Sequence, residues 1–163
     1  MTNIGATLAE PSGDLLNAII GVLPGSALAE LRAQRADILR HTQGSYDVLL
    51  SPEDPGGLSL PERALVARHV AELADHAALT THYQTLVAAR GAPSPGARRE
   101  AILAHAKRLA VAPGSATKAH LAALDAVGLS ARDIVALAQL VAFVAYQVRA
   151  AVGLSLLAQE KAA

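Results

Sequence analysis

LSLPERALVARHVAELADHAALTTHYQTLVAAR, residues 58–90, contains the clearest helix signals in this 163-residue chain. Ser59 and Glu62 have the spacing of a capping box, in which each side chain accepts a hydrogen bond from the other residue's backbone N–H. The apolar face of the helix that follows consists of Leu65, Val66, His69, Val70 and Leu73. We expect a break near Ala74 and Asp75, with Asp75 capping a second helix that Gly91 ends. The stretch therefore predicts two adjacent helices around which the rest of the chain packs.

The residues before this stretch are also predicted to be helical, with breaks at proline and glycine. The expected elements are a loose tail at 1–11, a short helix capped by Ser12 and ended by Gly21, a helix from Ser26 to about His41 ended by Gly44, a helical turn at 46–50, and a loop at 51–57. Because this loop has only seven residues, we interpret it as a connection and not as a linker between domains.

The residues after the stretch predict three more helices. The expected elements are a helix capped by Ser94 with Pro95 in its first turn and running to about Val111, a short helix started by Ser115 or Thr117 and ended by Gly128, and a last helix started by Ser130 and Asp133 and running to about Gln159. No segment alternates apolar and polar residues as a half-buried strand does. The sequence therefore predicts a single all-α domain, residues 1–163, with about six to seven helices.

The composition excludes several classes of function. Hydrophobic residues make up 52% of the chain, aromatic residues 2%, and the net charge is zero. Nucleic-acid binding is not expected, since it usually requires a basic surface and stacking aromatics. The chain has no cysteine, which excludes disulfides, thiolate metal sites and thiol catalysis within it. A near-zero net charge favours self-association.

The sequence also gives an expectation about location and cofactors. The first residues, MTNIGATLAEPSGD, have no basic region followed by an apolar run, so we expect no signal peptide. The most apolar run, between Asp133 and Arg149, is shorter than the roughly 20 residues of a membrane span. We expect a cytoplasmic protein in which this run is buried in the core or between subunits. No glycine-rich phosphate loop occurs, and no cofactor is expected.

Three of the six histidines fall close together, beside two carboxylates. If one helix continued through residues 65–80, His69, Glu72 and His76 would share one face and could hold a divalent metal. The alternative is that these side chains are hydrogen-bonded residues of a solvent or interface surface. His82 and Tyr83 could move protons, although Tyr83 also fits a core position with its hydroxyl hydrogen-bonded.

Other polar residues are assigned to surfaces or interfaces. His105 and His120 are expected on the surface, because each lies near a lysine on an amphipathic helix. Arg149 lies in an apolar run and, if buried, requires a partner from another helix or subunit. Gln139 and Gln147 are further candidates for an interface.

Two segments together resemble a known superfamily. LSLPERALVARHVAELADHAALTTHYQTLV is similar to the core helix pair of the carboxymuconolactone decarboxylase and alkylhydroperoxidase D superfamily. GLSARDIVALAQLVAFVAYQVRAAVGL resembles the long C-terminal helix of its peroxidase-related members. The resemblance covers about residues 44–158. It implies an all-helical fold of the alkylhydroperoxidase D type that assembles into dimers, trimers or hexamers.

The resemblance also implies positions for a site. Redox members carry CxxC at the start of the second core helix, followed by a histidine, with a glutamate on the preceding helix. In this chain the two cysteine positions fall at His76 and Leu79, and the histidine position falls at Tyr83, or at His82 in a shorter variant. The glutamate position falls at Ala64, with Glu62 close by. Without thiols, neither a sulfenic acid nor a disulfide can form.

Three hypotheses follow. The first is a cysteine-less member of the superfamily without thiol peroxidase activity, which associates with itself or with an active paralogue. The second is an acid–base enzyme of the carboxymuconolactone decarboxylase type, which binds a small acidic molecule through His76, His82, Tyr83 and Glu62. The third is a metal enzyme that uses His69, Glu72 and His76. We expect the protein to bind neither nucleic acid nor a membrane.

Overall fold

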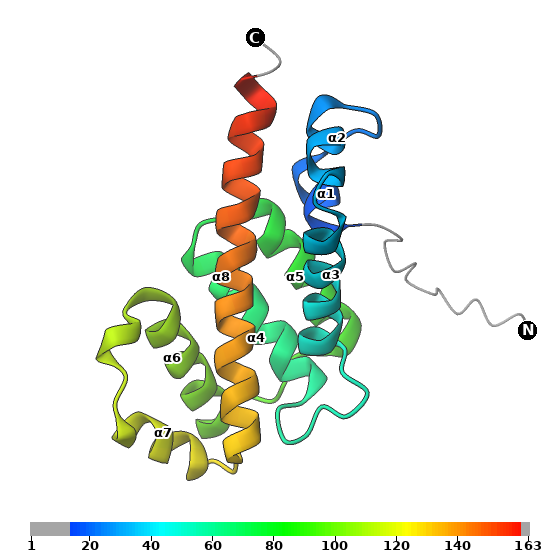
Figure 1. Ribbon diagram of the computed structural model, residues 1–163. Helices are drawn as coiled ribbons and strands as arrows, with labels where there is room; N and C mark the ends of the chain where they lie inside the picture. The colour runs from blue at the N-terminus through cyan, green and yellow to red at the C-terminus, as the bar shows by residue number, and fades with distance from the viewer. Residues whose placement is uncertain (1–13, 161–163) are drawn as a thin grey trace, which may run out of the picture.

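The computed structural model describes residues 14–160, and every regular element in that range is helical (Figure 1). The elements are α1 Leu15–Ile20, α2 Ala27–Ala33, α3 Ala36–Leu50, α4 Leu60–Leu73, α5 Ala77–Arg90, α6 Ala97–Val111, the 3-10 turn η1 Pro113–Ser115, α7 Lys118–Asp125 and α8 Ala131–Glu160. The predicted all-α class is therefore confirmed. The loose tail at 1–11 and the cap at Ser12 lie outside the described residues.

The α4–α5 hairpin begins at the predicted capping box. The Ser59 N–H donates to Glu62 Oε2 at 2.8 Å, and the Glu62 N–H donates to Ser59 Oγ at 3.4 Å. The predicted break occurs, but the prediction that Asp75 caps α5 is wrong. Asp75 has a positive φ of 52°, which ends α4 and differs from the extended backbone that a capping residue needs. His76 has that extended backbone, and its Nδ1 accepts a hydrogen bond from the Leu79 N–H at 3.3 Å.

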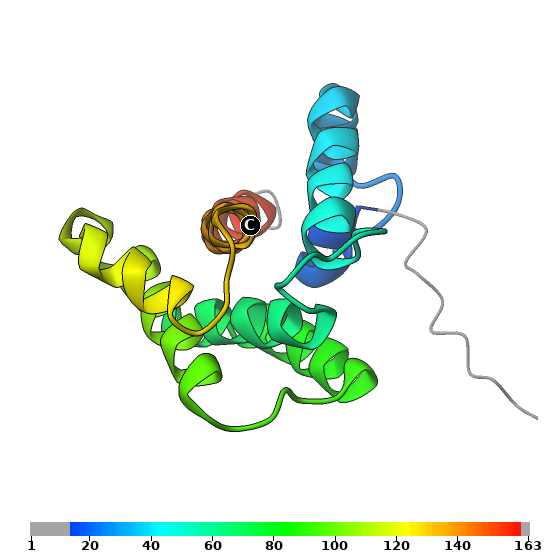
Figure 2. The same cartoon turned by 90° about the horizontal axis from the view of Figure 1, so that it is seen from below.

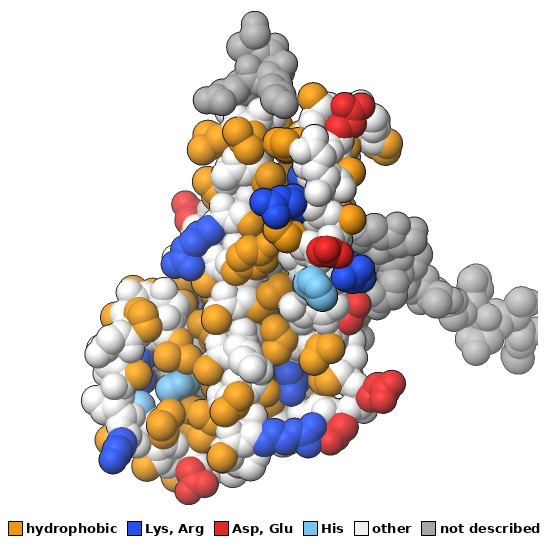
Figure 3. Space-filling model, viewed as in Figure 1, with side chains coloured by type: hydrophobic (Ala, Val, Ile, Leu, Met, Phe, Trp, Pro, Cys, Tyr) orange, Lys and Arg blue, Asp and Glu red, His pale blue; other side chains and the backbone are white. Residues whose placement is uncertain are grey.

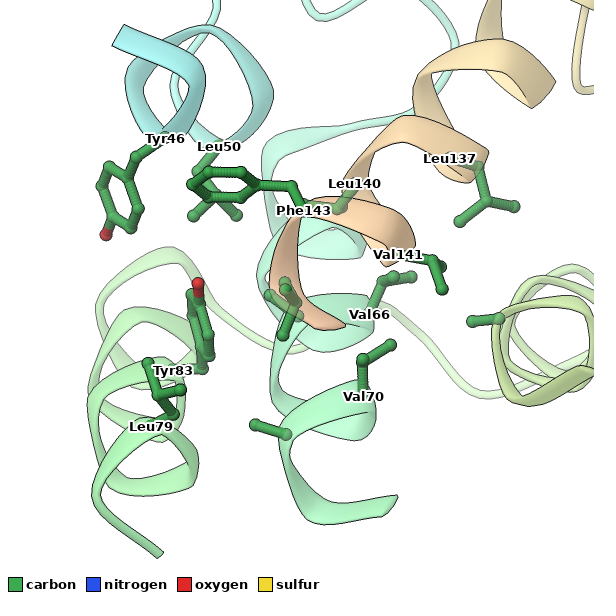
Figure 4. Packing of buried hydrophobic residues seen from close by; sticks show 14 of the residues in the cluster. Tyr46, Leu50, Val66, Val70, Leu79, Tyr83, Leu137, Leu140, Val141 and Phe143 are labelled. Carbon is green, nitrogen blue, oxygen red and sulfur yellow. The ribbon is translucent and has the colours of Figure 1, made fainter. Parts of the chain in front are cut away.

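Helix α8 is the central element of the fold. It packs across α4 and α6 and also contacts α1 and α3 (Figure 2). Apart from Asp133 and Gln147, its buried residues are apolar, and they meet α3, α4 and α5 in one core cluster (Figure 4). Ser130 and Asp133 start it as predicted, with the Ser130 N–H donating to Asp133 Oδ2 at 2.9 Å. The segment Ala131–Gln159 is, by length and composition, long and apolar enough to cross a membrane, so the prediction that the apolar run is too short for a span is not confirmed. In the fold, 39% of its most apolar window is buried.

The N-terminal helices differ from the prediction in two places. Asp14 caps α1 by accepting a hydrogen bond from the Leu16 N–H at 2.8 Å. Ser26 caps α2 as predicted, but the helix expected to reach His41 breaks after Ala33, and α3 then continues through Gly44 to Leu50. The prediction that Gly44 ends a helix is wrong because Tyr46 and Leu50, which follow it, are buried in the core. Their burial outweighs the cost of about 1 kcal/mol for a glycine inside a helix.

The cap predicted for α6 is also wrong. Helix α6 starts at Ala97 after Gly96, whose φ of 144° favours glycine, and no side chain caps it. Ser94 and Pro95 therefore belong to the preceding loop. Thr117 starts α7, where it forms a reciprocal cap with His120, and Gly128 takes the predicted left-handed conformation with φ of 83°.

Candidate functional site

Four polar side chains meet where α3, α5 and α8 pack together. We call them the tyrosine–histidine cluster, and they are Tyr46, His82, Tyr83 and Gln147. The Tyr46 hydroxyl and His82 Nε2 are 2.9 Å apart, and the Tyr83 hydroxyl donates to Gln147 Oε1. The His82 ring packs edge-on against Tyr83 with ring centroids 5.0 Å apart. Figure 4 shows the Tyr46 and Tyr83 rings pointing toward the boundary between α3 and α5.

Burial sets the protonation states of this cluster. Tyr83 and Gln147 are fully buried, Tyr46 is 9% exposed, and His82 is partly exposed. Burial and the neighbouring Tyr46 raise the pKa of Tyr83 well above its ordinary value, although its hydrogen bond to Gln147 acts in the opposite direction. Burial also lowers the pKa of His82. Burial therefore favours the neutral forms of Tyr83 and His82, and His82 is hydrogen-bonded to Tyr46.

The positions that the resemblance assigned to cysteines are occupied by a capping side chain and a core side chain. His76 caps α5, and Leu79 is 0% exposed within the core cluster. His76 and His82 are six residues apart on the chain, which is about 9 Å along a helix axis. Each makes its own local hydrogen bond, His76 to the Leu79 N–H and His82 to Tyr46. Of the expected catalytic positions, His82 and Tyr83 therefore lie in the tyrosine–histidine cluster, whereas His76 is used as the cap of α5.

Glu62 belongs to a different part of the fold. Its carboxylate accepts hydrogen bonds from Ser59 and from Arg98 Nε, the latter at 2.6 Å. Burial alone would raise the pKa of Glu62, but the hydrogen bonds from Arg98 and Ser59 outweigh it and lower the pKa. Glu62 lies in the first turn of α4, whereas His82 lies in α5. Glu62 therefore holds the start of α4 and is not part of the cluster.

The structure also separates the residues of the metal hypothesis. Helix α4 ends at Leu73, so His69, Glu72 and His76 do not share one continuous helix face. Glu72 forms an ion pair with Arg68 at 3.3 Å, and His76 caps α5. Within residues 14–160, no three histidine or carboxylate side chains gather closely enough to hold a metal ion.

Comparison with known proteins identifies the fold. No family model matches the chain, and no curated protein matches it significantly. An uncharacterized peroxidase-related protein from Silicibacter sp. TM1040 superimposes with a TM-score of 0.57 and 25% identity, over 73% of this chain and 69% of the other. The alkylhydroperoxidase AhpD core of an uncharacterized peroxidase-related protein from Ralstonia eutropha JMP134 gives a TM-score of 0.54 and 26% identity, with the same coverage. This chain has an AhpD-like fold.

Within the AhpD-like fold, the sequence did not identify two members of the tyrosine–histidine cluster. Tyr46 lies two residues after Gly44, in a segment expected to be a short helical turn. Gln147 was assigned to an interface, whereas it is fully buried. The available signal was a polar residue in the middle of an apolar helix, since such a residue needs a buried partner. Gln139 and Arg149, by contrast, are exposed on α8.

The prediction that His105 lies on the surface is wrong. His105 is 3% exposed on the inner side of α6, and its Nδ1 has no hydrogen-bond partner among residues 14–160. Burial, with contributions from Arg108 and His120, lowers its pKa. His120 is partly exposed, in the cap of α7. His105 lies in the core because its position on α6 continues the apolar face that contains Ile102 and Ala106.

We expect the AhpD-like fold to lose stability as the pH falls below about 6.5, the ordinary pKa of histidine. Because the pKa values of His82 and His105 are lowered in the folded chain, the unfolded chain binds the proton first and is favoured by acid. Above that pH these histidines are neutral in both states and contribute no pH dependence. The measurement is the thermal midpoint between pH 5 and pH 8, for the wild type and for His105→Gln. If His105 contributes to the pH dependence, the thermal midpoint of His105→Gln changes less between pH 5 and pH 8 than that of the wild type. An equal change in the two proteins would contradict its role.

Proposed function

We propose that this protein is a non-redox member of the AhpD-like superfamily, without thiol peroxidase activity, which functions by associating with a protein partner in the cytoplasm. The partner is another copy of the chain or an active paralogue. The observation that carries the proposal is Leu79, which is fully buried at the position of the second redox cysteine in the resemblance. An apolar core side chain fills the place where the peroxide chemistry would occur.

The chemistry of the remaining cluster supports this proposal. Reduction of a hydroperoxide by a thiol enzyme requires a thiolate that attacks the O–O bond and becomes a sulfenic acid. Neither imidazole nor phenol performs that two-electron step reversibly, and the whole chain has no cysteine. The Tyr83 hydroxyl donates its hydrogen bond to Gln147 in the core. The side chain at the position of the relay histidine in the resemblance therefore has a packing role.

We expect the purified protein to consume hydrogen peroxide and tert-butyl hydroperoxide no faster than buffer when a dithiol reductant is supplied. An active thiol peroxidase assayed in parallel sets the detection limit. Turnover above the background rate by the wild type, lost in His76→Ala or His82→Ala, would refute the proposal. The Leu79→Ala variant is a matched control, because it opens the same place in the core without adding a reactive group.

The Tyr46–His82 hydrogen bond favours a second candidate, an acid–base enzyme of the carboxymuconolactone decarboxylase type. A neutral His82 is a suitable general base, and burial favours that neutral form. The test is the decarboxylation of a carboxylated lactone followed by ultraviolet absorbance. This candidate requires activity that falls at least about 100-fold in His82→Gln, and it fails if the wild type leaves the lactone unchanged.

A further inference from the structure

A hollow lies between α8, α2 and the start of α3, apart from the tyrosine–histidine cluster. It has a volume of about 370 Å³, and α8 lines it with Tyr146, Arg149, Ala150, Gly153 and Leu154. No residue of the tyrosine–histidine cluster belongs to the lining. Because small-molecule sites in proteins have volumes of about 300–1,000 Å³, the hollow has room for a ligand of modest size.

Most of the lining of this hollow is apolar, and part of it is open to solvent. Leu16 is buried, whereas Leu31 is 42% and Ile38 is 50% exposed. Figure 3 shows hydrophobic side chains gathered along α8 and its border with α3 on this face, with basic side chains among them. A ligand with an apolar body would gain free energy by removing this surface from water.

Three arginines line the hollow, and they differ in their partners. Arg32 is paired with Asp14, with its Nη2 2.6 Å from Asp14 Oδ2. Within residues 14–160, the side chains of Arg35 and Arg149 form no ion pair or hydrogen bond, and no carboxylate lines the hollow. Two positive charges without a counter-charge beside one apolar hollow favour a negatively charged ligand.

A larger groove farther along α3 and α8 lacks this combination. Its volume is about 830 Å³, and its lining includes Arg40, Gly44 and Phe143. Arg40 forms an ion pair with Asp37 at 2.9 Å, so a carboxylate of the chain already offsets its charge. An anion is therefore expected to prefer the smaller hollow.

Gly153 leaves a space in the smaller hollow that the chain does not fill. A Cβ added at Gly153 would meet no atom of another element within 4 Å. Glycine is unfavourable inside a helix, and packing within residues 14–160 gives no reason for it at this position. An apolar group that lies along α8 would occupy the space.

The order of the lining residues along α8 gives such a ligand an orientation. Tyr146 and Arg149 come first, and the apolar lining residues follow toward the C-terminus. A carboxylate beside Arg149 would therefore be followed by an apolar body along the next turn of α8. Arginine suits this head group, because its planar guanidinium matches the geometry of a carboxylate.

We propose that this hollow binds an amphipathic monocarboxylate, a molecule with one carboxylate and an unbranched apolar chain. The carboxylate pairs with Arg35 and Arg149. The apolar chain lies against Ile38, Gly153 and Leu154. The inference goes beyond the proposed function, because it adds a small-molecule site on a part of the fold that is not involved in thiol chemistry.

Titration calorimetry of the full-length protein tests the ligand class, with decanoate kept below the concentration at which it forms micelles. We expect saturable binding of one decanoate per chain. Decanol should bind at least about tenfold more weakly because it lacks the charge, and acetate should not bind because it lacks the apolar chain. Equal binding of decanol and decanoate, or no saturable binding of decanoate, overturns the proposal.

Substitutions at two helical glycines locate the site. Gly153→Leu fills the smaller hollow and should weaken decanoate binding at least about tenfold. The matched control is Gly44→Leu, which places the same side chain in the larger groove, where an added Cβ also meets no atom within 4 Å. It should bind decanoate as the wild type does. Leucine is a better helix former than glycine, and far-UV circular dichroism verifies that both variants fold. Wild-type affinity in Gly153→Leu, or equal losses in the two variants, contradicts the assignment.

Removal of the two arginine charges tests the binding of the head group. Arg35→Gln/Arg149→Gln should weaken decanoate binding at least about tenfold and leave the weaker binding of decanol unchanged. The control is Lys107→Gln/Lys118→Gln, which removes two exposed positive charges from α6 and α7 and should keep the wild-type affinity. If both double variants lose the same affinity, the attraction is not specific to the hollow and the proposal fails.

Two further measurements identify other occupants of the hollow. Co-sedimentation of the wild type but not of Gly153→Leu with phosphatidylglycerol vesicles would assign the hollow to a membrane surface and overturn the proposal. Light scattering that shows a dimer in the wild type and a monomer in Gly153→Leu, without decanoate binding, would assign it to a second copy and also overturn the proposal. Peroxide consumption is measured separately, so the proposed function and the ligand site can fail independently.

Discussion

Arg63→Met is expected to lower the free energy of unfolding by about 3 kcal/mol, because it removes three hydrogen bonds from one buried guanidinium. Arg63 is 4% exposed. Its Nε donates to the Leu58 carbonyl and its Nη1 to the Leu49 carbonyl, each at 2.8 Å, and its Nη2 donates to the Pro55 carbonyl at 3.0 Å. These carbonyls belong to the end of α3, the loop at 51–57 and the start of α4. One side chain therefore holds the loop that joins α3 to the hairpin.

The measurement is urea unfolding followed by circular dichroism at a fixed protein concentration, because association changes the apparent stability. Methionine keeps the length of the aliphatic stem, so the variant tests the hydrogen bonds more than the packing. The control is Arg132→Met. Arg132 is exposed and holds the same loop through Asp54 at 2.8 Å, and an exposed ion pair contributes little. Equal effects of the two variants would refute the role of Arg63.

Tyr83→Phe is expected to lower the free energy of unfolding by about 2 kcal/mol, and Gln147→Leu in the same chain is expected to restore it. The Tyr83 hydroxyl donates to Gln147 Oε1 in the core. Without that hydroxyl, Gln147 keeps a buried acceptor with no partner, in addition to its Nε2, which has no partner among residues 14–160. Leucine has a similar volume and no polar atoms, so in the double variant neither position 83 nor position 147 keeps an unsatisfied polar side-chain atom.

The same urea measurement on the two single variants and the double variant gives the coupling energy of the pair. Tyr146→Phe is the matched control, because its hydroxyl is on an exposed tyrosine and meets Thr42 Oγ1 at 3.2 Å. The control should change stability by no more than about 0.5 kcal/mol. If the double variant is as unstable as the sum of the single variants, the two side chains are not coupled in the core.

Local signals in the sequence predicted the helices and most of their boundaries. The capping boxes at Ser59 and Ser130 were confirmed because a cap depends on residues three positions apart. The caps assigned to Asp75 and Ser94 were wrong, since backbone conformations at Asp75 and Gly96, which the sequence does not specify, decided where the next helix starts. The end predicted at Gly44 failed for a tertiary reason, the burial of Tyr46 and Leu50.

The candidate site depended on contacts between distant segments. His82 and Tyr83 were identified from their position in the resemblance, but Tyr46 and Gln147, 36 residues before His82 and 64 after Tyr83, have no local sequence signal that links them. Glu62 has the residue type expected at the site, but its carboxylate accepts hydrogen bonds from Ser59 and Arg98. The metal hypothesis required a helix through residue 76, and the helix ends at Leu73.

The sequence by itself determined the all-helical class, the helix pair at 58–90, the long last helix and the lack of thiol chemistry, because helix periodicity, capping and composition are local properties. Only the tertiary structure decided that Leu79 and His105 are buried, that Tyr46 meets His82, and that one side of α8 remains exposed. Each of these depends on which helix faces cover one another. That choice is made by the packing of the whole core and not by any segment alone.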